Sequence, residues 1–174
     1  VLKGAGSAWG GIDYHPSVRI GLQDNSSLPH FIDLHSGTAW NAAGVPGHEA
    51  EVDMAAFWYI TSGNSSPTLT CPAYSSALTY YPLFSSWSVR NQTMYDYYTS
   101  DNDLVTVAMF DEADNDSLLV NAYRPGSVSG LSKYAYTGKV LPFRTADGKY
   151  GLIRVIRADE VATGEMEIAI KIQK

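Results

Sequence analysis

One stretch of the chain carries most of the side chains that suit ligand recognition. Residues 80–98 hold seven aromatic rings with Ser, Asn and Arg between them. Exposed Trp and Tyr rings can cover the apolar face of a sugar, while neighbouring polar side chains bind its hydroxyl groups. In extended backbone, adjacent Tyr residues point to opposite faces, so one ring of each Tyr pair can reach solvent. We therefore predict an exposed binding platform whose members are Trp87, Tyr81, Tyr97, Arg90, Asn91 and Asp96.

A second interpretation of the same rings stays open. Aromatic side chains are more often buried than exposed, and they fill the core of many β-proteins. The two interpretations differ most clearly at Trp87, which lies among serines and outside any apolar run. Truncating an exposed ring would weaken binding, whereas truncating a core ring would weaken the fold.

Motifs for catalysis or metal binding are weak. The segment from Gly126 to Gly130 resembles a nucleophile elbow, but its middle position is Val128 where that motif needs Ser. His30 and His35 are five residues apart, so on one strand they would point to opposite faces. Cys71 is the only cysteine, which excludes a disulfide within the chain and a Cys/His metal cluster. We expect no catalytic residue, no metal site and no cofactor.

Two alternatives concern the acidic side chains. A glycoside-active enzyme would need two carboxyl groups roughly 5–10 Å apart, and the 18 acidic residues do not single out a pair. The run 111–116 is rich in carboxylates and could hold Ca²⁺, but it lacks the Gly and Glu of an EF-hand loop. A solvated hairpin loop is the interpretation that we favour for this run.

Composition limits the class of protein. The chain has 174 residues, of which 45% are hydrophobic and 17% charged, which suits one folded domain and excludes a disordered chain. The net charge of −6 and the scattered basic residues predict no nucleic-acid partner. No apolar run approaches the ~20 residues of a membrane-spanning helix. The start at Val1, without Met, suggests a processed or a trimmed chain, from which any signal peptide or lipid anchor would have been removed.

The last third of the chain gives the clearest pattern of secondary structure. Hydrophobic residues alternate with polar ones from Glu165 to Gln173, which predicts a strand with one buried and one wet face. Residues 150–156 are apolar on both parities and predict an interior strand. Asp147-Gly148 is a strong turn signal. Together with residues 139–145, these segments predict a three-stranded antiparallel meander.

Short strands are expected along the rest of the chain. The pattern predicts a hairpin over 31–40, a buried strand over 52–60 and further strands over 68–71, 104–110 and 118–123. Residues 73–81 suit either helix or strand. The spacing predicts an all-β fold with little helix, an antiparallel β-sandwich of jelly-roll or immunoglobulin-like type. We expect a flexible N-terminal arm over 1–16 and a single β-sandwich domain over 17–174.

Several stretches resemble an uncharacterised group of exported β-sandwich proteins, or lipoproteins, of Bacteroides-type gut bacteria. These stretches are FIDLHSGTAW (31–40), VDMAAFWYI (52–60), TLTCPAY (68–74) and GKYGLIRVIR with GEMEIAIKIQK (148–174). The resemblance implies export to the periplasm or cell surface, with lipid anchoring upstream of Val1, in the company of polysaccharide-uptake systems. It supplies no catalytic residue.

These expectations together favour a non-catalytic accessory or binding domain of the cell envelope. Its partner would be a carbohydrate or another envelope protein. A structural, adhesion-type interaction module is the main alternative, and a glycoside-active enzyme is a further one.

Overall fold

The larger of the two main sheets has six antiparallel strands in the order β1-β11-β10-β9-β6-β7. The computed structural model describes residues 9–61, 64–96 and 104–174. The strands of this sheet are β1 (Ile12–Gly21), β11 (Glu165–Gln173), β10 (Tyr150–Ala158), β9 (Val140–Arg144), β6 (Met94–Asp96) and β7 (Val128–Ser129). β1 and β7 are its edges, so in the described part of the chain it does not close into a barrel.

The smaller sheet has three antiparallel strands, and a short hairpin lies beside it. The sheet consists of β4 (Ala55–Thr61), β5 (Asn64–Thr70) and β8 (Leu131–Ser132), and the hairpin of β2 (Phe31–Ile32) and β3 (Ala39–Trp40). An isolated bridge between Ile32 and Met54 joins the hairpin to the residue just before β4. The predicted hairpin and the strand within 52–60 are therefore confirmed.

Helices are few and short among the described residues. The α-helices are α1 (Ala77–Tyr80), α3 (Val107–Glu112) and α4 (Ser117–Ala122), and the 3-10 helices are η1 (Glu49–Glu51), η2 (Pro82–Ser86) and η3 (Pro125–Ser127). The fold is therefore mostly β with antiparallel sheets and little helix, as the sequence predicts. Residues 73–81, which suit helix or strand by sequence, contain α1.

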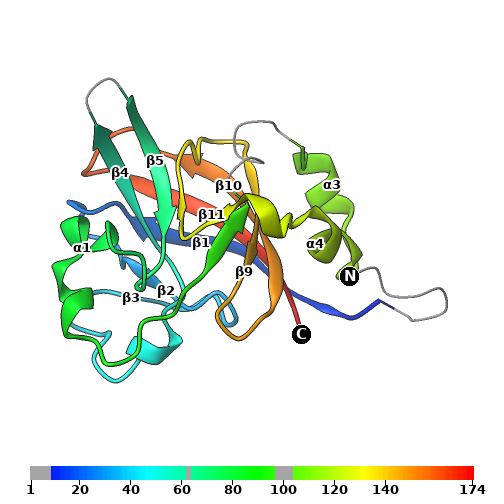
Figure 1. The fold of residues 1–174 in the computed structure, drawn as a ribbon. Coiled ribbons are helices and arrows are strands. Elements are labelled where there is room, and N and C mark those ends of the chain that lie inside the picture. The colour runs from blue at the N-terminus through cyan, green and yellow to red at the C-terminus, as the bar shows by residue number, and fades with distance from the viewer. Residues whose placement is uncertain (1–8, 62–63, 97–103) are drawn as a thin grey trace.

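The elements form layers on both sides of the two sheets. Figure 1 shows α3 and α4 on one side of the molecule and α1 on the other, with the strands between them. One apolar cluster joins α3 and α4 to the outer face of the six-stranded sheet. A second joins the two sheets, and a third joins the outer face of the three-stranded sheet to α1 and η2.

The C-terminal meander forms as the sequence predicts. β10 pairs with both β9 and β11, and the turn before β10 contains Gly148 at φ +92°. Alternate residues of β11 are buried between the sheets with Ile153 of β10 and Met54 before β4; they are Met166, Ile168, Ile170 and Ile172. The period-2 prediction for this face is confirmed.

The opposite face of β11 corrects the sequence prediction. Lys171 should have been solvated, yet only 5% of its surface is exposed. Its ammonium group donates hydrogen bonds to the carbonyl oxygens of Phe110 (2.7 Å), Asp111 (3.3 Å) and Ala113 (2.7 Å), at the end of α3. A lysine suits this place because the last carbonyl groups of a helix lack partners within the helix and carry partial negative charge.

Two segments predicted as strands are helices. Residues 104–110 and 118–123 overlap α3 and α4, respectively. Short apolar runs fit either structure, and at α3 a cap favours the helix, because the Thr106 side chain accepts a hydrogen bond from the Met109 amide. The acidic run 111–116 therefore crosses from α3 towards α4 and is not a hairpin loop. Asp116 is buried and accepts hydrogen bonds from the Gly10 amide and Gln173.

The structure also places the predicted N-terminal arm and the single cysteine. β1 begins at Ile12 and residues 12–15 pair with β11, so this part of the predicted arm is a strand. Cys71 is fully buried, as a lone cysteine packing as a small hydrophobe should be, and burial raises the pKa of its thiol.

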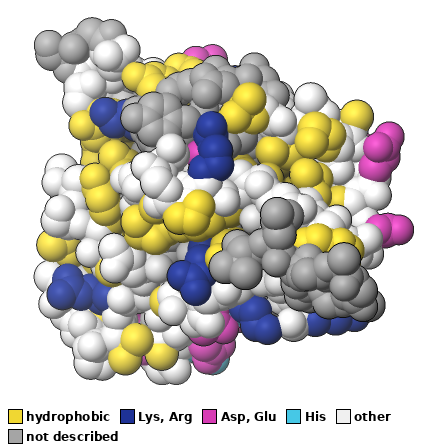
Figure 2. Space-filling view, turned by 45° about the vertical axis from the view of Figure 1, so that its right-hand side comes forward, with side chains coloured by type: hydrophobic (Ala, Val, Ile, Leu, Met, Phe, Trp, Pro, Cys, Tyr) yellow, Lys and Arg dark blue, Asp and Glu magenta, His cyan; other side chains and the backbone are white. Residues whose placement is uncertain are grey.

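The length of the helices and the distribution of Lys and Arg side chains are the features relevant to a membrane or a nucleic acid as partner. None of the helices in the described ranges is long and apolar enough to span a membrane. On the face drawn in Figure 2, the Lys and Arg side chains are separated from one another by hydrophobic and uncharged side chains.

Replacing Ile170 by Ala tests the packing between the sheets. Ile170 is fully buried, so its truncation should lower the free energy of unfolding by about 2–5 kcal/mol. Val161→Ala is the control, because half of Val161 is exposed and the change should stay within about 0.5 kcal/mol. Urea unfolding measures both, and equal small losses would contradict the buried position of Ile170.

Candidate functional site

Two members of the predicted aromatic platform lie in the core. Trp87 is 8% exposed and packs with Phe31 and Phe84, at ring-centroid distances of 5.7 and 4.7 Å. Tyr81 is 4% exposed, and its hydroxyl donates a hydrogen bond to the Ala56 carbonyl oxygen. The platform hypothesis is therefore wrong for both residues. Tyr81 follows α1 directly and Trp87 follows η2 directly, so these short helices, and not a continuous strand, set the direction of both rings.

The remaining predicted residues divide into three groups. Asp96 is fully buried and forms a bidentate ion pair with Arg124, whose Nε and Nη2 atoms each lie 2.8 Å from a carboxylate oxygen. Tyr97 lies outside the described residues. Arg90 is exposed and Asn91 half-buried, and both line the same pocket. Of the five predicted residues that the structure describes, Arg90 and Asn91 share a pocket, whereas Tyr81 and Trp87 share a core cluster.

That pocket has a volume of about 520 Å³ and lies where β6 and β9 meet. We call it the arginine pocket, after two of its lining residues, Arg90 and Arg144. Its other lining residues are Asn91, Gln92, Met94, Tyr123, Thr145 and Ala146. Guanidinium, amide and phenol groups therefore surround one volume.

A second pocket of about 310 Å³ adjoins the first, because Asn91 and Ala146 line both. We call it the carboxylate pocket, and its remaining lining residues are Asp33, His35, Ala50, Glu51, Asp53 and Asp147. Together the two pockets form a site with basic groups at one end and acidic groups at the other.

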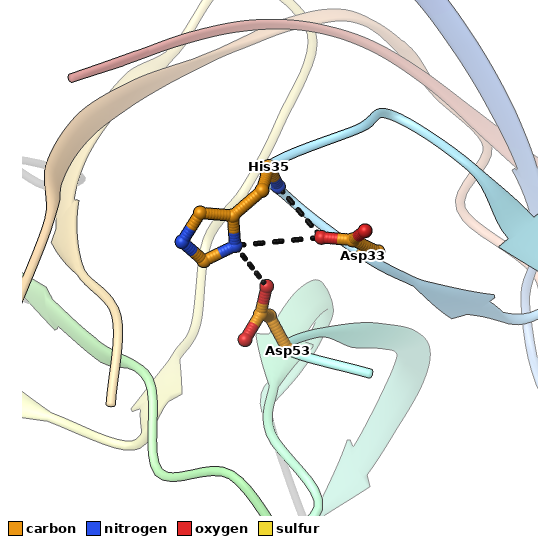
Figure 3. Close-up of side chains that lie close together, drawn as sticks. All are labelled: Asp33, His35 and Asp53. Atoms are coloured by element: carbon orange, nitrogen blue, oxygen red, sulfur yellow. Dashed lines mark hydrogen bonds and ion pairs between the residues drawn. The ribbon is translucent and has the colours of Figure 1, made fainter. Parts of the chain in front are cut away.

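His35 lies at the centre of the carboxylate pocket, between three Asp side chains. Its Nδ1 atom is 3.2 Å from Asp53 Oδ2 and 3.4 Å from Asp33 Oδ1. Figure 3 shows the ring between these two carboxylates, with a dashed line to each. Its Nε2 atom is 3.2 Å from Asp147 Oδ2. Each ring nitrogen therefore faces at least one carboxylate.

Turns and strand ends place these groups. Asp33 and His35 follow β2, where Asp33 accepts hydrogen bonds from the His35 amide and the Ser36 hydroxyl. Gly37 completes this turn at φ +70°, a value that glycine adopts without strain. Asp53 precedes β4 and accepts a hydrogen bond from the Leu34 amide.

The other side of the pocket is fixed in the same way. Asp147 lies in the turn between β9 and β10 and accepts a hydrogen bond from the Thr145 hydroxyl. Asn91 precedes β6, and its amide group donates to the carbonyl oxygens of Ala50 and Val52. The hydrogen bonds hold both walls of the pocket in place before any ligand arrives.

The charges in the pocket keep His35 protonated. Hydrogen bonds to Asp33 and Asp53 raise the pKa of His35 to about 10, despite partial burial. Burial raises the pKa of Asp53, although the His35 hydrogen bond opposes the rise. Burial also acts to raise the pKa of Asp33, but hydrogen bonds from His35 and Ser36 outweigh it, so the pKa is lowered. At neutral pH His35 is an imidazolium and cannot act as a general base.

The same three residues form the one set, in the described part of the chain, whose ligand atoms are grouped closely enough for a metal ion. Asp33, His35 and Asp53 each offer one such atom, and these atoms lie within 4.8 Å of one another. Two oxygens and a nitrogen suit a divalent cation. Such a cation would have to displace the Nδ1 proton of His35. The positive charge of this protonated ring already pairs with the carboxylates of Asp33 and Asp53.

Sequence reasoning missed this cluster for an identifiable reason. Asp53 and Asp147 are 18 and 112 residues from His35, so no local motif contains the set. Two signals were present: Asp33 and His35 flank the buried Leu34, and Asp53 interrupts an otherwise apolar run. A buried Asp needs a partner, but the sequence does not identify which of the four histidines provides it.

Comparison with known proteins gives a relationship in fold. No protein-family model matches the chain, and no curated protein matches it. It is similar to the crystal structure of a DUF4466 family protein from Parabacteroides merdae, with a TM-score of 0.65 and 16% identity. The match covers 94% of this chain and 54% of that one, so this chain spans about half of the solved structure's length. The resemblance of the sequence to an uncharacterised protein family of Bacteroides-type gut bacteria is thereby confirmed at the level of the fold.

Trp87→Ala should now destabilise the protein. Loss of a core Trp side chain typically costs about 3–5 kcal/mol of unfolding free energy. Val89→Ala serves as the control, because 46% of Val89 is exposed. Chemical unfolding of both variants measures the loss of unfolding free energy. A loss for Trp87→Ala no larger than that for the control would contradict the buried position of Trp87.

His35 should stay protonated well above its ordinary pKa of 6.5. We expect its imidazole proton signals in an NMR titration to move near pH 10 and to be constant between pH 6 and 8. Because the folded-state pKa is raised, the stabilisation is complete below pH 6.5 and is lost as the pH rises through about 10. His35→Gln should remove that part of the pH dependence, whereas His48→Gln should retain it. A midpoint near pH 6.5 for His35 would contradict the ion-pair cluster.

Proposed function

We propose that this chain is a non-catalytic binding domain of the cell envelope and that a carbohydrate occupies the two adjoining pockets. The single observation that carries the proposal is the shared wall at Asn91 and Ala146, which joins two sets of polar groups into one site. Binding sites typically combine a concave shape with a few well-placed polar groups.

The chemistry of the two ends suits a sugar chain. The Asp147 carboxylate, whose side chain is 57% exposed, is a hydrogen-bond acceptor for hydroxyl donors, and the carboxylates of Asp33 and Asp53, paired with His35, lie beside it. At the other end, the Arg90 and Arg144 guanidinium groups and the Gln92 amide are donors. A carbohydrate presents hydroxyl groups that both donate and accept, so it can satisfy both ends. Hydrogen bonds to charged groups contribute roughly 1.5–3 kcal/mol each.

The state of His35 favours binding over catalysis. A hydrolytic site needs a group that takes up or releases a proton near the working pH. His35 holds its proton far above neutrality, because carboxylates surround it. Its ion pairs also occupy the carboxylates of Asp33 and Asp53.

One observation favours a glycoside-active enzyme as the second candidate. The pKa of Asp53 is raised by burial, whereas hydrogen bonds from His35 and Ser36 lower that of Asp33. Glycosidases use one protonated and one ionised carboxyl group, and environments that separate two pKa values can supply such a pair.

The remaining expectations form part of the same proposal. We infer that the two facing sheets form a β-sandwich and that the chain is exported to the periplasm or cell surface, with lipid anchoring upstream of Val1. No nucleic acid is expected to bind, since the net charge is −6. Another envelope protein in place of the carbohydrate would make the chain an adhesion-type module.

A glycan array, run beside an activity screen on the same sugars, tests this function. We expect retention of at least one glycan without cleavage. Asp147→Asn should weaken that binding roughly tenfold, because it removes a charged acceptor from the carboxylate pocket. Asp13→Asn is the matched control, because its side chain is 50% exposed, comparable to the 57% of Asp147, and lies outside both pockets.

Three results would count against the proposal. If the array retains no glycan, carbohydrate binding is refuted. If Asp147→Asn and Asp13→Asn weaken binding equally, the location of the site at the carboxylate pocket is refuted. Cleavage of a glycan, abolished by Asp53→Asn, would establish the enzyme in place of the binding domain.

A further inference from the structure

The arginines of the chain divide into two groups by their partners. Four of the six form ion pairs with carboxylates; they are Arg19, Arg124, Arg154 and Arg157. Within residues 9–61, 64–96 and 104–174, Arg90 and Arg144 form no such pair. The chain has 18 acidic residues and 12 basic ones, so carboxylates outnumber the cations they could neutralise. Both arginines without a carboxylate partner line the same pocket.

Arg144 is held in place by contacts that leave its charge unneutralised. Its guanidinium carbon lies 5.4 Å from the centroid of the Tyr150 ring, a cation–π distance. A Cβ atom at Gly148 would lie 3.1 Å from its Nη2 atom, so the guanidinium packs closely against this turn. Its backbone is fixed in β9, where Arg144 pairs with Met94 of β6. An ordered arginine loses less conformational freedom when it binds a ligand.

The adjoining carboxylate pocket makes one end of the site acidic, whereas the arginine pocket makes the other end basic. Asp33, Asp53, Asp147 and Glu51 line it, and His35 supplies its only positive charge among the described lining residues. An anionic group would be repelled from that end and attracted to the arginine end. Neutral hydroxyl groups would find acceptors at the acidic end. The charges therefore favour a ligand with an acidic group at one end and hydroxyl groups at the other.

We propose that the arginine pocket binds an oxyanion and that its ligand is the carboxylate of an acidic sugar. This inference rests on the proposed function and narrows the glycan to the uronic-acid class. Guanidinium groups present planar pairs of N–H donors that match the two oxygens of a carboxylate. Gln92 adds an amide donor to the same pocket. Free phosphate or sulfate has the same oxyanion chemistry, so the experiment has to separate these sources.

Isothermal titration of the whole chain compares an acidic oligosaccharide with its neutral form. The probes are oligogalacturonate, the same oligosaccharide with its carboxylates methyl-esterified, and inorganic phosphate alone. A panel of other uronate-containing and neutral glycans accompanies them. We expect an acidic glycan to bind at least tenfold more tightly than its esterified or neutral counterpart, with phosphate weaker than either.

Three Arg→Gln substitutions, each of which removes one positive charge, test whether the arginine pocket binds the acidic glycan. Arg90→Gln and Arg144→Gln should each reduce binding of the acidic glycan at least tenfold and weaken binding of its neutral counterpart by a clearly smaller factor. Arg19→Gln is the control, because Arg19 is exposed, lies on β1 and pairs with Glu165 outside both pockets. Thermal unfolding checks that each variant is folded, and exposed Arg90 keeps the test valid if Arg144→Gln unfolds.

The possible failures are distinguishable. Binding of neutral glycans alone, or equal weakening by Arg19→Gln, would overturn the oxyanion site and leave the carbohydrate-binding function standing. Phosphate binding that depends on Arg90, without binding of any glycan, would support the oxyanion site and refute the uronic-acid ligand and the proposed function together. Binding of none of the probes would overturn both.

Discussion

The burial of apolar side chains between the two sheets is the constraint on which the rest of the structure depends. β11 contributes four alternate residues to this layer, and β4 and β5 contribute Ala56 and Leu69 from the other sheet. Fully burying a side chain of this size contributes roughly 1.5–3 kcal/mol, so the layer outweighs any single polar contact in the molecule. Once the sheets face each other, the positions of their strand ends are fixed.

The candidate site is a consequence of those fixed strand ends. Asp33 and His35 follow β2, Asp53 precedes β4, and Asp147 lies between β9 and β10. Asn91 ties the segment before β6 to the residues before β4 through its amide group. Four segments that are distant in sequence thus meet at one edge of the layered core. Loops on a rigid scaffold often carry function for this reason.

The sequence predicts the parts of the fold in which a local pattern and burial agree. The alternation in β11 and the Gly148 turn are local, and the structure confirms both. The far face of β11 could not be predicted, because the sequence does not reveal that α3 ends above Lys171. The same limit applies to α3 and α4, whose short apolar runs fit strand or helix equally well.

The candidate site was harder to predict than the fold, because its members are joined by contacts over long sequence distances. Arg90 and Asn91 were selected for their chemistry and do line a pocket. Tyr81 is predicted to be exposed on the assumption of extended backbone, and Trp87 because serines surround it in the sequence, but both rings pack in the core beside α1 and η2. The His35 cluster combines three segments, so it becomes visible only after the sheets are assembled.

The separation of charge in this site raises a physical question that the local contacts answer. Arginines and carboxylates that line adjoining pockets would gain energy by pairing, since opposite charges attract over several ångströms. Here the carboxylates are already satisfied by His35 and by amide and hydroxyl donors. Arg144 is restrained over the Tyr150 ring and against the Gly148 turn. Each end is therefore fixed by its own neighbours, and a ligand that matches both ends can bind without first breaking an ion pair between them.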